Sequence, residues 1–105
     1  MTDVMIDIET LSTEPNAVVL TIGAIKFNRK EELRALKDYD TFYIRVEPKS
    51  CEDIGCTIDS ATVNWWNKQS PDAKFEALEH PDRVPIKDAL IEQIDNPVQW
   101  SKSIK

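Results

Sequence analysis

Residues 4–11, VMIDIETL, place two acids inside an apolar run that otherwise has the composition of a β-strand. Side chains alternate between the two faces of a strand, so Asp7 and Glu9 point to one face and their apolar neighbours to the other. We therefore expect a strand over residues 3–9 with one apolar face and one acidic face. Such an acidic face is either simply solvated or a site for cations.

Two more strands are predicted in the first half of the chain. Residues 17–27, AVVLTIGAIKF, are apolar on both faces near their middle, which is typical of an interior strand. Gly23 within this segment predicts a bulge or a close backbone approach. Residues 41–46, TFYIRV, alternate between apolar and polar, and Pro48 ends this third strand.

The connections between these strands favour antiparallel pairing. The first, STEPN at residues 12–16, is short and rich in turn-forming residues. The second, NRKEELRALKDYD at residues 28–40, is strongly charged. It is either a solvated hairpin tip or a short surface helix, and we favour the tip. Because the second strand is expected to be internal, we expect the first strand to have a neighbour on each side.

The second half of the chain is predicted to be helical. Asp59 or Ser60 can cap a helix in SATVNWWNKQ, residues 60–69. Ser70 followed by Pro71 is the pattern of a second helix start.

A third helix is predicted over residues 85–95, PIKDALIEQID, where apolar side chains recur with helical spacing. These side chains are Ile86, Ala89, Leu90 and Ile94. Asn96 and Pro97 end this helix, and VQW at residues 98–100 begins a fourth strand. The predicted order is βββαααβ, an α/β domain of three mainly antiparallel strands, then helices, then the start of a fourth strand.

Composition narrows the class of protein. Of 105 residues, 41% are hydrophobic and 30% charged, the ordinary balance of a soluble globular domain. No apolar run approaches the ~20 residues of a membrane span, and the N-terminus does not resemble a secretion signal. We therefore expect no membrane contact, a cytoplasmic location, and reduced thiols at Cys51 and Cys56. Zinc binding is disfavoured because His80 is the only histidine.

The net charge of −6 argues against passive, charge-driven binding of nucleic acid. It is compatible with an enzyme that meets phosphate through bound metal. Asp7 and Glu9 lie at the carboxyl end of the first strand, where open sheets commonly place their sites. Cα atoms two apart on a strand are roughly 6.5 Å from each other, so both carboxylates can reach one or two hard cations.

Two segments carry a resemblance to a known family. DIETLSTEPNAVVLTIGAIKF, residues 7–27, resembles the first exonuclease motif of the DEDD superfamily, in which Asp-x-Glu-Thr lies on the first strand of a ribonuclease H-like sheet. With TIDSATVNWWNKQSPDAK, residues 57–74, the pattern is similar to a smaller family of phage and bacterial 3′–5′ exonucleases. That family includes the phage DexA-type exodeoxyribonuclease and the mycobacterial exoribonuclease. The resemblance covers essentially the whole chain and implies a ribonuclease H-like fold.

The resemblance also implies a two-metal exonuclease that hydrolyses single-stranded or 3′-ended DNA or RNA from the 3′ end. Asp7 and Glu9 would be catalytic and hold two ions, Mg²⁺ or Mn²⁺, at a separation of roughly 3.5–4 Å. Thr10 and Leu11 would contact the terminal nucleotide through backbone groups and an apolar contact. The alternative is a purely structural role, with Thr10 as a turn residue and Leu11 as a core residue. No motif distinguishes DNA from RNA.

Trp65, Trp66 and Gln69 are further candidates for substrate contact. Because the two tryptophans are adjacent on a helix, they point in partly different directions, and at least one is expected in the core. The other can form a wall for a base, since stacking on an aromatic ring is worth roughly 1–3 kcal/mol per base. Gln69 lies one turn away and can donate a hydrogen bond to the same place.

The family pattern needs four acids and a histidine base, and this chain matches only the first acidic motif. His80 does not fit the base, because the family places an Asp five residues after it and this chain has Pro85 there. Residues 1–105 are therefore expected to be the N-terminal portion of a single exonuclease domain. A second chain or self-association would complete the open fold.

The alternative is a non-catalytic truncated or split fragment that acts as an interaction module. A third, remote reading is a small acidic domain of unrelated function.

Overall fold

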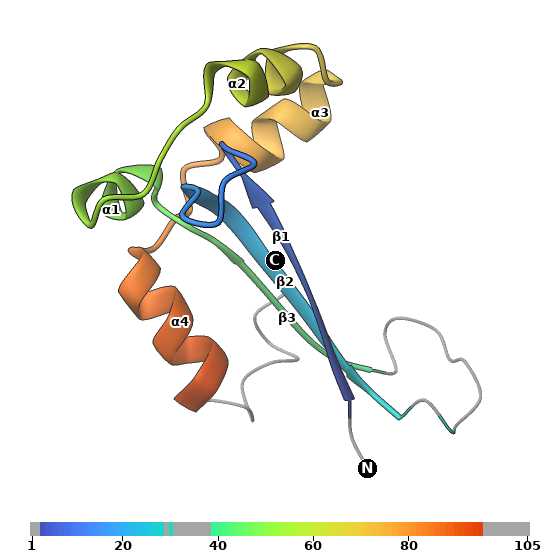
Figure 1. Ribbon diagram of the computed structural model, residues 1–105. Coiled ribbons are helices and arrows are strands. Elements are labelled where there is room, and N and C mark those ends of the chain that lie inside the picture. The colour runs from blue at the N-terminus through green and yellow to red at the C-terminus, as the bar shows by residue number, and fades with distance from the viewer. Residues whose placement is uncertain (1–2, 29, 31–38, 96–105) are drawn as a thin grey trace.

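The computed structural model describes residues 3–28, 30 and 39–95 (Figure 1). The strands are β1 (Asp3–Thr10), β2 (Val19–Phe27) and β3 (Asp40–Arg45). The helical segments that follow are α1 (Pro48–Asp53), α2 (Ser60–Asn67), α3 (Pro71–Lys74), the π-helix η2 (Phe75–Glu79) and α4 (Ile86–Asp95). This order confirms an α/β domain in which three strands precede the helices.

The three strands form one antiparallel sheet in the order β1-β2-β3. β2 is the central strand, as its apolar sequence predicted. β1 lies at an edge of the sheet that the described strands form. The second neighbour expected beside β1 is therefore not found within the described part of the chain.

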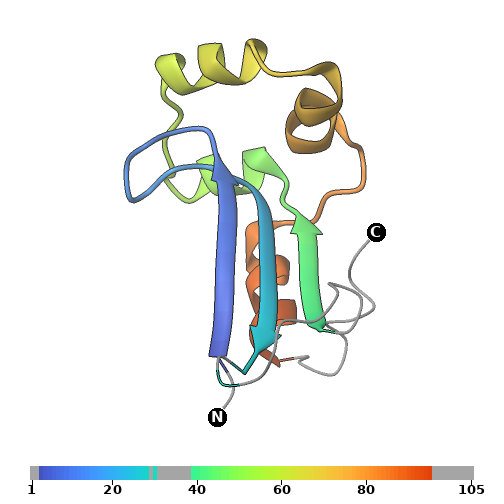
Figure 2. The same ribbon diagram turned by 90° about the vertical axis from the view of Figure 1, so that its right-hand side faces the viewer.

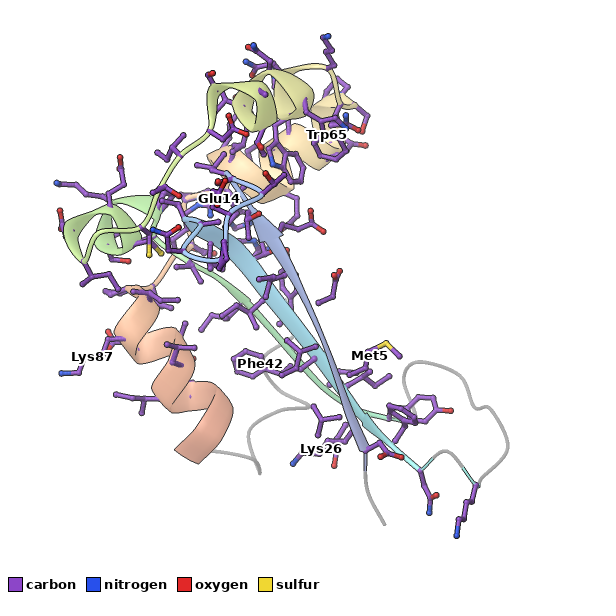
Figure 3. The ribbon with its side chains drawn as sticks, viewed as in Figure 1. Met5, Glu14, Lys26, Phe42, Trp65 and Lys87 are labelled. Atoms are coloured by element: carbon purple, nitrogen blue, oxygen red, sulfur yellow. The ribbon has the colours of Figure 1, made fainter. Side chains whose placement is uncertain are left out.

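The two faces of the sheet differ. Figure 3 shows Phe42 pointing toward α4, and Met5 pointing to the opposite side. Ala24 pairs with Phe42 and shares the face toward α4, and both belong to the hydrophobic core. The core members are Leu11, Val18, Leu20, Ile22, Ala24, Phe42, Val46, Cys51, Trp66, Ala77 and Ala89. In β1, Ile6 pairs with Ala24 and Ile8 with Ile22, so Ile6 and Ile8 share this face. Each of them is nevertheless about half exposed, because the core is centred on β2 and β3.

A β-bulge interrupts the pairing of β1 with β2. Glu9 pairs with Thr21 but Thr10 pairs with Val19, so Leu20 is an extra residue on β2. The Leu20 carbonyl accepts a hydrogen bond from the Val46 amide at 2.9 Å. The bulge lies at Leu20, so it is not at Gly23, where the sequence had predicted a bulge or a close approach.

The caps of α2 and α3 are those that the sequence predicted. The Asp59 carboxylate accepts from the Ala61 amide at 3.1 Å and from the Thr62 hydroxyl at 3.2 Å. The Ser70 hydroxyl oxygen accepts from the Ala73 amide at 3.2 Å, and a proline occupies the first position of α3. The contacts to the Ala61 and Ala73 amides satisfy donors that the start of a helix leaves without an intrahelical partner.

Two helical features differ from the expectation. Pro48 was predicted only to end the third strand, but it also occupies the first turn of α1, a position that suits proline because it needs no amide hydrogen. The helix that begins at Pro71 continues as η2, in which the His80 amide donates to the Phe75 carbonyl at 2.8 Å. No local sequence pattern predicts this π-helical turn.

Arg83 joins the end of η2 to the sheet. Its guanidinium donates to the carbonyls of Ala77 at 2.7 Å, Val46 at 2.9 Å and Leu20 at 3.2 Å. Its Nε donates to the His80 carbonyl at 2.8 Å. Burial lowers the pKa of Arg83. A connection that the sequence marked only as rich in helix breakers is thus fixed by main-chain oxygens.

α4 begins directly after Pro85, as predicted, and buries Ala89 completely while Leu90 stays about half exposed. The predicted strand at 98–100 and most of the 28–40 connection lie outside the described residues. No helix in the described part of the chain is long and apolar enough to span a membrane.

Candidate active site

The acidic face of β1 continues across β2 and β3. Side chains of directly paired residues lie on the same face of a sheet. The register builds two cross-strand rows, which we name the Asp7 row (Asp7, Gly23, Tyr43) and the Glu9 row (Glu9, Thr21, Arg45). Gly23 is the middle residue of the Asp7 row, and an added Cβ there would make only ordinary van der Waals contacts, at 3.7 Å from Tyr43 Cδ1 and 3.8 Å from the Asp7 carbonyl oxygen.

The carboxylates at the β1 end of these rows have no positive partner among the described residues. Asp7 is exposed and Glu9 is half-buried. Burial raises the pKa of Glu9, and the nearby Asp7 carboxylate raises it further. Two unpaired like charges on one face are an arrangement that a divalent cation stabilises.

The β3 end of the same rows is closed by a charge pair. Arg45 is only 6% exposed, and its Nη2 donates to Glu76 Oε1 at 2.8 Å while its Nε donates to Oε2. The Tyr43 hydroxyl donates to Glu76 Oε2 at 2.7 Å. The hydrogen bonds from Arg45 hold the pKa of Glu76 below its ordinary value, so this third carboxylate is ionised and already occupied.

A cavity of about 440 Å³ opens beside Glu9, between the end of β1 and the start of α2. Its polar lining is Glu9, Thr10, Ser12, Thr13, Asp59 and Thr62. The indole rings of Trp65 and Trp66 contribute apolar wall. The cavity therefore combines two carboxylates, hydroxyl groups and aromatic surface.

Trp66 is the core member of the tryptophan pair. It is 5% exposed, and its indole N–H donates to the Thr10 carbonyl at 2.9 Å. The Thr10 hydroxyl in turn donates to the Ser12 carbonyl at 2.7 Å. These bonds tie α2 to the turn that directly follows the two acids.

Trp65 is the exposed member, with 53% of its surface accessible. Its ring meets that of Trp66 edge to face, with centroids 4.9 Å apart and an interplanar angle of 82°. Gln69 donates from Nε2 to the Trp65 carbonyl at 2.9 Å and is not part of the cavity lining. The expectation of one core indole and one accessible indole is confirmed.

Leu11 lies just beyond the end of β1, where the chain turns. Continued alternation would put Leu11 on the acidic face with Glu9, but the strand ends at Thr10. The Leu11 amide donates to the Val18 carbonyl at 2.9 Å, and the Leu11 side chain is buried in the core. Leu11 therefore does not line the cavity, whereas its neighbour Thr10 does.

The structure gathers Glu9, Thr10, Trp65 and Trp66 around the cavity, with Asp7 on the same face of β1. Sequence reasoning treated Asp59 only as a helix cap and overlooked it as a lining residue. The Asp59 amide donates to the Leu11 carbonyl at 2.8 Å, which brings this residue beside the β1–β2 turn. That contact joins residues 48 positions apart, so no local pattern signals it.

The chain matches the family model for the 3′–5′ exoribonuclease Rv2179c-like domain over residues 2–99. It belongs to the Rv2179c-like 3′–5′ exoribonuclease family. The match includes both acids and the whole cavity lining, and it confirms the predicted 3′–5′ exonuclease family. No curated protein and no solved structure matches the chain.

Within this Rv2179c-like domain, Asp7 and Glu9 are the described residues best suited to hold a metal. The described part of the chain contains no group of three or more His, Cys, Asp or Glu side chains that could hold an ion. Two carboxylates and retained waters suit Mg²⁺ or Mn²⁺, which accept hard oxygen ligands and keep part of their hydration shell.

Proposed function

We propose that this chain takes part in the 3′–5′ exonucleolytic hydrolysis of RNA or DNA by a two-metal-ion mechanism, in which it supplies the first acidic motif. The observation that carries the proposal is the unpaired carboxylate pair next to a cavity with an aromatic wall. The family description names an exoribonuclease, which favours RNA.

In this proposal each candidate residue has a distinct role. Asp7 and Glu9 hold the ions on the open face of β1. When bound, such ions lower the pKa of a water and stabilise the departing 3′ oxygen. Trp65 offers its ring to the terminal base, and Thr10 meets the same nucleotide at the rim of the cavity. Leu11 supports this turn from the core.

A complete site of this kind needs more acids and a general base than Asp7 and Glu9 provide. We propose that they come from outside the described residues or from a second chain beside the open edge of β1. The DEDD and DexA-type assignments and the ribonuclease H-like description of the fold belong to the same proposal.

The edge strand supports a second candidate, a non-catalytic interaction module. Met5, Ile6 and Ile8 are 60%, 55% and 49% exposed, an unusual state for apolar residues in one strand. A module of this kind would bind another chain through β1 and would not depend on the charge of Asp7.

The deciding experiment is digestion of a 5′-labelled oligoribonucleotide, and of its deoxy counterpart, in Mn²⁺. Wild-type protein should produce a ladder shortened from the 3′ end, and Asp7→Ala and Glu9→Ala should not. Glu52→Ala is the matched control, because Glu52 is an exposed acid on α1. Equal ladders from all variants would refute the nuclease role of Asp7 and Glu9. No ladder from the wild type would refute hydrolysis by this chain without a second one and favour the interaction module.

A further inference from the structure

The segment that carries the tryptophan pair crosses the end of the sheet. We name residues 60–79, which form α2, α3 and η2, the helical cap. Figure 2 shows it running from above β1 to the side of β3. Its first attachment is the hydrogen bond from the Trp66 indole to the Thr10 carbonyl, at the β1 end. The Trp66 and Ala77 side chains of the cap are also buried in the core.

Glu76 provides the second attachment, at the β3 end. Its carboxylate receives both Arg45 and the Tyr43 hydroxyl, so three hydrogen bonds hold η2 to the sheet. A cation–π contact between Arg45 and Tyr43 also supports this arrangement, since the Arg45 Cζ lies 5.4 Å from the centroid of the Tyr43 ring. The attachment is thus directional as well as charged.

The position of Glu76 along the chain is itself constrained. Glu76 lies in the π-helical turn, which Arg83 anchors through the Ala77 carbonyl at 2.7 Å. A turn with i→i+5 bonding is wider than an α-turn, and such turns are frequent at functional sites. The backbone that presents the Glu76 carboxylate to the sheet is therefore held by Arg83 directly after Glu76.

The two residues of the sheet that bind Glu76 belong to the same cross-strand rows as the acids. Tyr43 shares the Asp7 row and Arg45 shares the Glu9 row, with only β2 between. Because β2 is buried and central, the distance between the two ends of each row is fixed by the sheet. We therefore expect a change at Glu76 to act on the cap more than on Asp7 or Glu9.

We propose that Glu76 is a positioning residue, which through Arg45 and Tyr43 sets the placement of the Trp65 ring relative to the acidic face. This inference rests on the proposed function, since it assigns Trp65 to nucleotide contact. A paired buried arginine adds little net stability compared with apolar packing of similar volume. What the pair does supply is one defined orientation of the cap.

The test compares Glu76→Gln with Glu76→Asp and Tyr43→Phe. Binding of 5′-AMP in Mn²⁺ is measured by calorimetry, well below the unfolding temperature of each variant, together with binding of Mn²⁺ alone. Glu76→Gln should weaken 5′-AMP binding by about tenfold, the size of a lost stacking contact, while Mn²⁺ binding changes less than about twofold. Glu76→Asp should restore part of the loss because it keeps the charge. Asp53→Asn, in an exposed pair with Lys49, is the matched control.

A second measurement does not depend on nucleotide binding. Acrylamide quenching of each protein and of its Trp65→Phe version gives the accessibility of Trp65 by difference. Glu76→Gln should change that accessibility, and Tyr43→Phe, which keeps the ion pair, should change it less. Unchanged quenching in Glu76→Gln would overturn the inference, whether or not 5′-AMP binds. Unchanged 5′-AMP affinity in a variant that only melts earlier would overturn it as well. Altered quenching without any 5′-AMP binding by the wild type would support the positioning role and refute the nucleotide site.

Discussion

The two ends of the Asp7 and Glu9 rows differ in how their charges are satisfied. At the β3 end, Arg45, Tyr43 and Glu76 form a closed set of hydrogen bonds around one ion pair. At the β1 end, Asp7 and Glu9 find no positive partner within the described residues, and burial together with Asp7 raises the pKa of Glu9. Acids on a strand are therefore weak evidence for a site until their partners are known. Here both ends lie on one face of the sheet, and within the described residues the acids of only one end are paired with a positive charge.

The largest expected effect is on catalysis at the open end. Asp7→Asn should lower the rate of nucleotide release by more than ~100-fold, because even the outer partners of metal ligands are worth ~10–100-fold. Glu76→Gln should lower it much less. Single-turnover rates on a labelled oligoribonucleotide measure both. If both variants lost a comparable share of the rate of nucleotide release, the β1 end and the β3 end would not differ in their importance for catalysis.

The next effect is on stability at the closed end. Glu76→Ala should cost about 3 kcal/mol, because it leaves the charge of Arg45 buried without a partner. Arg45→Met should cost only about 1 kcal/mol, since Glu76 is 42% exposed and can be hydrated while Met fills the apolar space. Urea unfolding at pH 7 measures the two free energies. The reverse order would show that the buried guanidinium does not depend on Glu76.

Divalent cations should stabilise the open end by a smaller amount. At a Mn²⁺ concentration ten times the dissociation constant, the wild type should gain about 1.4 kcal/mol of unfolding free energy. Asp7→Asn and Glu9→Gln should gain little, whereas Glu76→Gln should gain as much as the wild type. Thermal melts with and without Mn²⁺ test this. An equal gain in all variants would place the ion elsewhere.

The smallest effects, on the pH dependence of stability, should have opposite signs at the two ends. The pKa of Glu76 is lowered on folding, so its contribution is present above its ordinary value of 4.5 and lost as the pH falls through the folded value. The pKa of Glu9 is raised, so the folded state is favoured below pH 4.5 and loses that advantage as the pH rises through the folded value. Glu76→Gln should flatten the acid loss, and Glu9→Gln should raise stability at pH 7 by no more than about 0.5 kcal/mol. Urea midpoints from pH 3 to 7 provide the comparison.

The elements that alternation and capping chemistry control could be predicted from the sequence. The period-two pattern around Asp7 and Glu9 places the acidic face, and the caps at Asp59 and Ser70 begin their helices as expected. Both signals are local, since they act over two to four residues. Part of the cavity lining, including Glu9 and Trp65, could be predicted from such local patterns.

The missed features depend on contacts between distant segments. Arg45 and Glu76 are 31 residues apart, and the partners of Arg83 are main-chain carbonyls that any residue supplies. The second neighbour expected beside β1 stays a prediction, because the predicted fourth strand at 98–100 lies outside the described residues. Such features follow from the assembled fold and leave no pattern in neighbouring residues.

The extra residue at Leu20 has a consequence beyond the pairing of β1 with β2. Its carbonyl accepts both the Val46 amide and the Arg83 guanidinium, so β2 stays bonded to the rest of the fold at the very position where its ladder with β1 is interrupted. A one-residue shift of register at that point would therefore disturb the Arg83 connection together with the strand that carries the two acids.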